Sequence, residues 1–186
     1  MNKNIDYEIP GDTEPQKMLW LAAAFAGSAA MIVRSLLENS DYSERAQGRV
    51  VAYLCRHATE LYLKGAIGIA TGKVNRSNHN IHNLYSEYES IYQGKGDFFF
   101  FEFPVEKWVT SNEDLFPETL VFFRKSHDQR FRYPADSRGT EFVGFEEIDI
   151  PSLVKILEKF SSALNIRAYF LGEHGVNAQG FLDSHG

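Results

Sequence analysis

The chain has 186 residues, of which 44% are hydrophobic and 24% are charged, and its formal net charge at pH 7 is -6. This length suits one well-packed core and is too short for two ordinary domains. The negative charge argues against a protein that coats nucleic acid through bulk charge, although a local basic groove needs only a few well-placed Lys and Arg residues. The one cysteine, Cys55, cannot form an intramolecular disulfide, so we expect a cytoplasmic protein.

The first predicted element is a helix over about residues 14–38. Its apolar run, residues 18–33, contains no charged residue, but it is shorter than the roughly 20 residues that cross a bilayer. Acidic residues precede this run where a signal peptide carries positive charge. We therefore expect a buried helix and no membrane segment, with Thr13 as its cap and Pro15 in its first turn. Its alanine-rich surface would let a neighbouring helix approach closely.

A second helix is predicted over about residues 43–71, and its two faces differ in character. One face is an apolar, heptad-like seam with spacings of three and four, formed by Val51, Leu54, Ala58, Leu61, Gly65 and Gly68. The opposite face carries Arg49, Arg56, Glu60 and Lys64, with His57 at its edge. The simpler interpretation is an ionic face, stabilised by i,i+4 pairs, that orients the helix against its neighbours. The alternative is an anion or nucleotide-phosphate groove made by the three cations with His57.

A third helix is predicted over about residues 80–92, with Asn78 or Asn80 as its cap. His79 and His82 stand three positions apart at its start, and His57 could join them as a metal ligand. No local Asp, Glu or Cys completes a recognisable ligand set, and zinc sites need three or four ligands. Helix capping is the simpler interpretation, so we expect no metal site and no cofactor.

The segment of about residues 95–148 is predicted to be an insert with structure of its own, because so long a structureless loop is unusual in a compact domain. It begins with four consecutive phenylalanines, residues 98–101, and its part near 130–148 alternates around a turn-rich stretch, which suggests a β-hairpin. The simpler interpretation of the aromatic cluster is an auxiliary core that caps the helices. The alternative is a surface that binds a partner.

The last predicted helix begins near residue 149 and runs to about residue 171, where Gly172 and Gly175 mark its end. Its apolar face has helical spacing and consists of Leu153, Leu157, Phe160, Leu164, Ala168 and Leu171. The tail of about residues 173–186 has no periodicity, and we expect it to be mobile. Arg167 and His174 are seven positions apart, so they share a face of the helix if the helix continues that far.

Two strings in the chain resemble a known family. RHATELYLKG, residues 56–65, followed by HNIHNLYSEY, residues 79–88, looks like the middle of a HEPN domain. The resemblance implies an all-α fold, an up-and-down four-helix bundle that forms a single domain over residues 1–186, here with a small α/β insert before the last helix. Members of this family usually form homodimers in which two catalytic pairs face each other across a cleft.

In HEPN ribonucleases the final helix carries an Arg and, after roughly four to six residues, a His. Arg167 and His174 match that pattern, which makes them the candidate catalytic pair. The His would move the proton of the 2′-hydroxyl or of the leaving oxygen, and the Arg would hold the phosphate. Ala168 departs from the pattern, because the family commonly has a small polar residue directly after the Arg.

The expected function is therefore binding or processing of RNA or nucleotides. One form of it is a metal-independent endoribonuclease of a toxin–antitoxin or phage-defence system, with an antitoxin as a protein partner. The alternative is a non-catalytic HEPN-like module that binds a nucleotide, RNA or protein through the ionic face or the aromatic insert. The chain has no Gly-rich phosphate loop, GxSxG or HExxH motif, so dehydrogenase, kinase and hydrolase activities have no support.

Overall fold

The computed structural model describes residues 8–38, 44–101 and 150–185. The elements in these ranges are α1 (Glu14–Glu38), α2 (Glu44–Thr71), α3 (Ile81–Tyr92), the 3-10 helix η1 (Asp97–Phe99), α6 (Ile150–His174), the 3-10 helix η2 (Gly175–Asn177) and α7 (Ala178–His185). All of them are helical, which confirms the all-α class, and these ranges contain no strand. The hairpin predicted near 130–148 lies outside the described residues.

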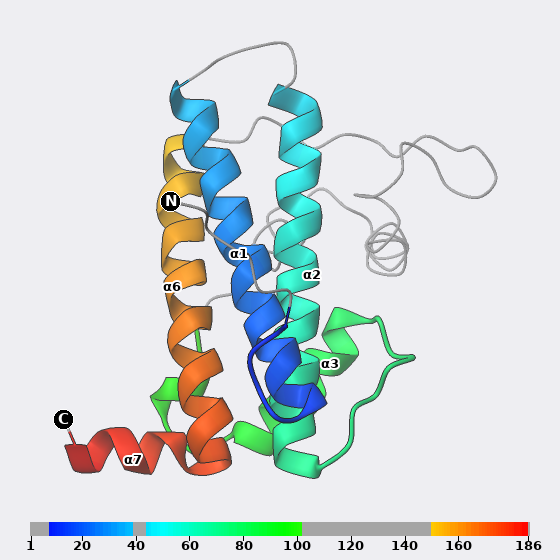
Figure 1. The fold of residues 1–186 in the computed structure, drawn as a ribbon, viewed down its shortest axis with the longest axis vertical. Helices are drawn as coiled ribbons and strands as arrows, with labels where there is room; N and C mark the ends of the chain where they lie inside the picture. The colour runs from blue at the N-terminus through cyan, green and yellow to red at the C-terminus, as the bar shows by residue number, and fades with distance from the viewer. Residues whose placement is uncertain (1–7, 39–43, 102–149, 186) are drawn as a thin grey trace, which may run out of the picture.

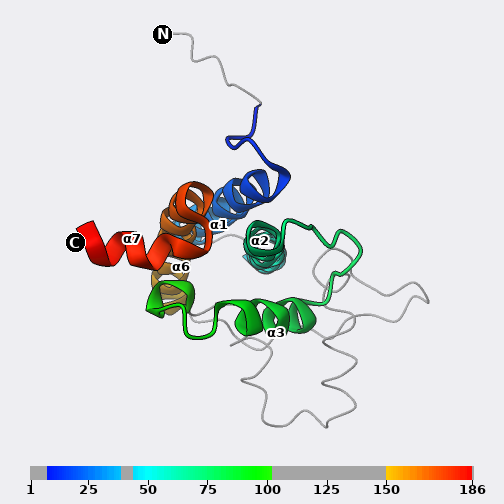
Figure 2. The same ribbon diagram turned by 90° about the horizontal axis from the view of Figure 1, so that it is seen from below.

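The three long helices α1, α2 and α6 run alongside one another (Figure 1). Helix α1 packs against both α2 and α6, while α3 packs against α2. The view along the long helices shows α1 on one side of α2 and α3 on the other (Figure 2). Helix α2 therefore has a neighbouring helix on each of two sides, and these neighbours surround its ionic residues.

Helix α1 begins where the sequence predicts, with Thr13 as its cap. The Gln16 backbone N–H donates to Thr13 Oγ1 at 3.4 Å, and the Thr13 N–H donates to Gln16 Oε1 at 2.9 Å. This reciprocal pair is a capping box. Helix α3 is capped by Asn80, whose side-chain oxygen accepts from the backbone N–H groups of His82 and Asn83.

Helix α1 is also the one described helix that is long and apolar enough to cross a membrane. The core helix of a soluble protein has the same length and composition, and α1 has the contacts of a core helix. One face of it is buried against α2 and α6, through Leu19, Ala22, Ala23, Ala26, Ala29, Val33 and Leu36.

The glycines of the apolar seam allow α1 and α2 to approach closely. A Cβ atom on Gly65 would lie 2.8 Å from the carbonyl oxygen of Pro15, and one on Gly68 would lie 2.9 Å from Pro15 Cγ. The predicted close approach is thus present. The atoms nearest to the two glycines on α1 belong to Pro15 and Leu19 in its first turns, rather than to the alanines further along the helix.

The aromatic residues at the start of the insert belong mainly to the core. Phe99 is fully buried, and Phe98 and Phe101 are partly buried against the main core cluster. Phe100 is 37% exposed. For Phe98, Phe99 and Phe101 the auxiliary-core interpretation holds, whereas Phe100 is exposed, and the remainder of the insert lies beyond the described residues.

The end of the chain is helical beyond residue 171, where the sequence predicts that the last helix ends. Helix α6 passes through Gly172 to His174, and Gly175, with φ of 57°, ends it in the left-handed conformation. Residues 175–185 then form η2 and α7. Contacts from distant parts of the chain explain the correction: Gln16 Nε2 donates to the Gly172 carbonyl at 2.9 Å, and Ala178 is fully buried.

Candidate functional site

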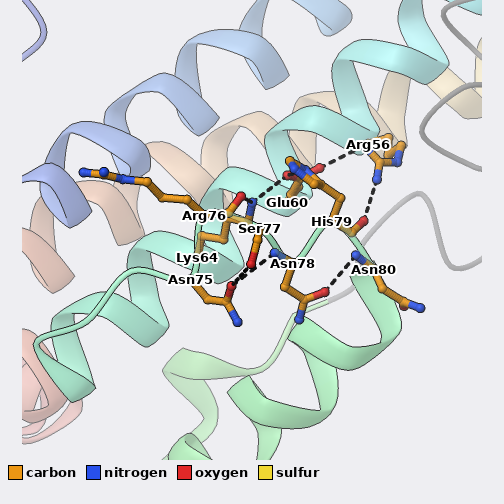
Figure 3. A network of polar contacts seen from close by, with 9 residues as sticks. All are labelled: Arg56, Glu60, Lys64, Asn75, Arg76, Ser77, Asn78, His79 and Asn80. Carbon is orange, nitrogen blue, oxygen red and sulfur yellow. Dashed lines mark hydrogen bonds and ion pairs between the residues drawn. The ribbon is translucent and has the colours of Figure 1, made fainter.

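Glu60 lies at the centre of a buried ionic cluster on α2 (Figure 3). Arg56 Nη1 donates to Glu60 Oε2 at 2.9 Å, and Lys64 Nζ lies 3.0 Å from Glu60 Oε1. His79 Nδ1 contacts the same Oε1 at 2.8 Å from the other side. The side chains of Arg56, Glu60 and Lys64 are each only 5% exposed, whereas that of His79 is 59% exposed.

The cations of this cluster also hold the connection between α2 and α3. Arg56 Nη2 donates to the His79 carbonyl at 2.8 Å, and Lys64 Nζ donates to the Arg76 carbonyl at 3.3 Å (Figure 3). The Arg76 side chain itself bonds Glu14 with two nitrogen–oxygen contacts of 2.9 and 2.7 Å. The 72–80 connection is therefore fastened to α2 from inside and to the first turn of α1 at the surface.

The electrostatics of Glu60 follow from these contacts. Burial by itself raises the pKa of its carboxyl, but the hydrogen bond from Lys64 and the positive charges of Arg56 and Lys64 lower it, so the pKa lies below its ordinary value. The carboxylate is thus ionised at neutral pH. A buried ion pair of this kind must keep all of its partners, because removing one leaves an uncompensated charge in the interior.

The structure brings together only part of the predicted ionic face. Arg56, Glu60 and Lys64 form one buried cluster, which is compatible with the interpretation of an ionic face that orients the helix against its neighbours. The Arg56 Nη atoms and Lys64 Nζ bond Glu60 and loop carbonyls, so an anion would have to displace these bonds, while the buried Arg56 Nε has no partner in the described ranges. The ring of His57 stacks on Tyr53 and meets Phe25 edge-on, at centroid distances of 5.7 and 4.7 Å.

The remaining candidates on α2 and α3 occupy other positions. Arg49 is partly buried near the beginning of α2, about two turns before Arg56. His82 lies in the first turn of α3, where its backbone N–H donates to Oδ1 of the Asn80 cap at 3.0 Å. Within the described ranges there is no group of three or more His, Cys, Asp or Glu residues that could hold a metal ion.

Arg167 projects from α6 into a group of aromatic rings. Its guanidinium carbon lies 4.2 Å from the ring centroid of Phe101 and 4.9 Å from that of Phe98. Nη1 donates to the Ala163 carbonyl at 3.3 Å, and the buried Nε has no hydrogen-bond partner in the described part of the chain. Burial lowers the pKa of Arg167 from its ordinary value. The arginine is thus held by rings and one carbonyl, with no carboxylate among the described residues to balance its charge.

Two buried tyrosines lie beside Arg167 and fix the rings beneath it. The hydroxyls of Tyr62 and Tyr88 are 3.0 Å apart, and the Tyr88 hydroxyl donates to the carbonyl of Phe99. Burial raises the pKa of Tyr88 to about 12, so this hydroxyl remains protonated and can keep donating. The pair thereby connects α2 and α3 to the turn that carries Phe98 and Phe99.

His174 ends α6, and its ring is partly buried by aromatic neighbours. Phe181 of α7 stacks on it with a centroid distance of 3.9 Å and an interplanar angle of 15°, and the Phe170 centroid lies 6.0 Å away. Phe170 in turn meets Phe98 edge-on at 6.0 Å, and Phe98 lies under Arg167. Arg167 and His174 thus border one continuous row of rings among the described residues.

Several residues that shape these sites are not evident from the sequence. His79 looks like a capping or metal-binding residue, and only its position opposite Glu60 shows its role as a partner of that carboxylate. Phe181 and Gln179 lie in a stretch without periodicity. The sequence gives only a weak signal for Phe181: it is an aromatic residue seven positions after His174, and no nearby residue indicates what it contacts.

The described part of the chain is therefore all-helical, with a buried ionic cluster on α2 and with Arg167 and His174 of α6 each in contact with aromatic rings. Comparison with known proteins adds no relationship to this description. No family model matches the chain, and no curated protein and no solved structure matches it at a significant level.

Proposed function

We propose that this protein is a HEPN-like ribonuclease that binds RNA at the C-terminal end of α6 and cleaves it without a metal ion, with Arg167 and His174 as the reacting pair. The proposal combines the resemblance of residues 56–88 to HEPN domains with the environment of Arg167. It also includes a homodimer, a cytoplasmic location and, for a toxin–antitoxin or phage-defence protein, an antitoxin partner.

The environment of Arg167 is the observation that carries the proposal. Arg34, Arg56 and Arg76 each bond a carboxylate, on Glu158, Glu60 and Glu14 respectively. Arg167 has no carboxylate partner within the described ranges, although its side chain is partly buried and its Nε is fully buried. A buried cation without a counter-ion destabilises a protein, and such local conflicts are concentrated at functional sites. A bound phosphate would supply the missing negative charge.

The course of α6 also supports the pairing of Arg167 with His174. The helix is continuous from Ile150 to His174, so Gly172 does not interrupt it. Seven residues of helix place the two positions on the same face, about 10 Å apart along the axis. A phosphate between two long side chains fits this spacing. The buried position of Ala168 is consistent with a small apolar residue in place of the family's small polar one.

The chemistry needs only groups that the chain supplies. The 2′-oxygen of a ribose attacks the adjacent phosphorus while a histidine removes its proton. The 5′-oxygen of the next nucleotide leaves and takes a proton from the histidine of the second copy. Arg167 stabilises the charge that develops on the phosphate oxygens. The products are a 2′,3′-cyclic phosphate and a 5′-hydroxyl end.

The test is cleavage of total RNA and of a tRNA pool in EDTA by the parent protein and by Arg167→Met and His174→Ala variants. We expect the parent alone to cleave and to leave 2′,3′-cyclic phosphate ends. Because Arg167→Met removes a charge that meets no carboxylate in the ranges that the structure describes, we also expect this variant to unfold at the same temperature as the parent or at a higher one. Thermal denaturation followed by circular dichroism measures this second effect.

The matched control is Arg34→Met, which removes the same charge from an exposed side chain on α1 and should leave cleavage unchanged. A folded parent that cleaves no RNA would contradict catalysis and would favour the non-catalytic binding module. A large loss of stability in Arg167→Met would show instead that Arg167 has a structural role.

A further inference from the structure

The short helix α7 contacts the surroundings of both members of the Arg167–His174 pair. We infer that α7 positions this pair, with Phe181 orienting the ring of His174 and Gln179 fixing the turn that supports Arg167. The inference rests on the proposed function, because it assigns positioning residues to that same site. Neither residue belongs to the HEPN-like strings or to the predicted catalytic pair.

Phe181 restrains His174 directly. Their rings are nearly parallel, with centroids 3.9 Å apart, and Phe181 also lies 6.1 Å from the centroid of Phe170. A stacked neighbour limits rotation of the imidazole and leaves the ring edge, where both nitrogens lie, uncovered by Phe181. A proton-transferring histidine needs this arrangement, because its ring must be fixed while its nitrogens stay reachable.

Gln179 holds the turn that carries Phe98, whose ring lies beside Arg167. Its Oε1 accepts from the backbone N–H of Phe98 at 2.8 Å, and its Nε2 donates to Asp183 Oδ1 at 2.6 Å, which keeps the amide in one orientation. The 96–98 turn passes so close to this side chain that a Cβ atom on Gly96 would lie 2.4 Å from Gln179 Cγ. The ring of Phe98 lies 4.9 Å from the Arg167 guanidinium, so the position of this turn determines the position of that ring.

Helix α7 is anchored to the core at its first residue. Ala178 at its first position is fully buried and belongs to the main core cluster. Gln179 and Phe181 then lie within one turn of each other on the same short helix, which extends across the end of α6 (Figure 1). Gln179, which holds the turn beside Arg167, and Phe181, which stacks on His174, are thus only two positions apart on one helix.

The first experiment observes the imidazole signals of His174 by NMR of histidine-labelled protein, with the signals assigned through a His174→Asn variant. In the parent, the stacked ring of Phe181 should shift these signals, and Phe181→Ala should remove that shift. Phe100→Ala is the matched control, because Phe100 is 37% exposed against 36% for Phe181 and does not stack on His174. Unchanged His174 signals in Phe181→Ala would overturn the inference.

The second experiment compares cleavage by the parent with that by Phe181→Ala and by Gln179→Met, which keeps the side-chain length but removes the acceptor for the Phe98 N–H. We expect kcat to fall by about tenfold to a hundredfold, as misplacement of reacting groups causes, with little change in KM. Equal kcat values in a parent that cleaves and in both variants would overturn the inference. A folded parent that does not cleave would overturn the proposed function, and the His174 signals would then decide separately whether α7 fixes that ring.

Discussion

Glu60 shows how strongly the environment of one side chain can differ from what its sequence neighbours suggest. It has cationic residues four positions before and after it, as on many exposed helices, yet its carboxylate is buried and also contacts His79. Exposed pairs of this kind contribute at most about 1 kcal/mol, whereas removing one partner from a buried pair costs about 3–5 kcal/mol. The cluster therefore matters mainly for the stability of α2 and of the connection that it holds.

Replacing Glu60 by glutamine should lower the free energy of unfolding at pH 7 by about 3 kcal/mol, because Arg56 and Lys64 would be left buried without a counter-ion. Folding lowers the pKa of Glu60 below its ordinary value of 4.5, so its ionised form stabilises the folded state. That stabilisation is present above about pH 4.5 and is lost as the pH falls through the folded-state pKa. Urea denaturation between pH 3 and pH 7, a range that brackets the carboxyl pKa, measures both effects.

Glu158→Gln serves as the control for this prediction, since Glu158 pairs with Arg34 at the surface. Its effect at pH 7 should stay below about 1 kcal/mol. Equal losses in the two variants, or an unchanged acid dependence in Glu60→Gln, would show that the buried cluster does not have the energetic role assigned to it.

At the scale of elements, the contact between α1 and α2 depends on the absence of side chains at two positions. Gly65 and Gly68 lie against Pro15 and Leu19, so the backbones approach more closely than any larger residue would permit. Glycine within a helix otherwise destabilises it by roughly 0.5–1 kcal/mol relative to alanine. Tertiary contact here outweighs local helix propensity.

Gly65→Ala should therefore destabilise the protein by about 1–3 kcal/mol, because the new Cβ would lie 2.8 Å from a backbone oxygen that cannot move aside easily. Gly48→Ala on the same helix should be neutral or stabilising by about 0.5–1 kcal/mol, since a Cβ there meets nothing within 4 Å. Urea denaturation of both variants measures the difference. Similar stabilities for the two would contradict the close approach of α1 and α2.

At the scale of the whole molecule, the described helices form layers around α1 and α2. Helix α1 is held by α2 and α6, and α2 is covered on its other side by α3 and the 72–80 connection (Figure 2). Helix α7 projects from the end of α6 and has few neighbours (Figure 1). Such an arrangement distributes local stability unevenly, with the most protected backbone where a helix has partners on several sides.

Native-state hydrogen exchange should show this distribution. We expect the slowest amide exchange in the middle of α1, around residues 19–33, and faster exchange in α7, which opens without unfolding the rest. In Phe181→Ala the exchange of α7 should become faster still, because the stack with His174 is lost. Mass spectrometry of peptides from timed exchange measures both effects, and exchange in α7 as slow as in α1 would contradict this description.

Local signals in the sequence were sufficient for much of the fold. Apolar periodicity and caps predicted the bounds of α1, α2 and α3 closely, because Thr13 and Asn80 bond to backbone groups within four residues of themselves. The same signals located the start of α6. For its end they were misleading, because a glycine such as Gly172 ends a helix only where no other contact stabilises the next turn.

What the sequence determined by itself is thus the set of long helices, their main apolar faces and the position of Arg167 seven residues before His174 on the last of them. The tertiary structure decided the rest: the burial of Glu60 and its cations, the rings around Arg167 and the folding of α7 over His174. The physical reason is distance along the chain. Caps and i,i+4 pairs act within one turn, whereas Arg56 meets a carbonyl 23 residues away and Gln179 an amide 81 residues away, contacts that no local pattern encodes.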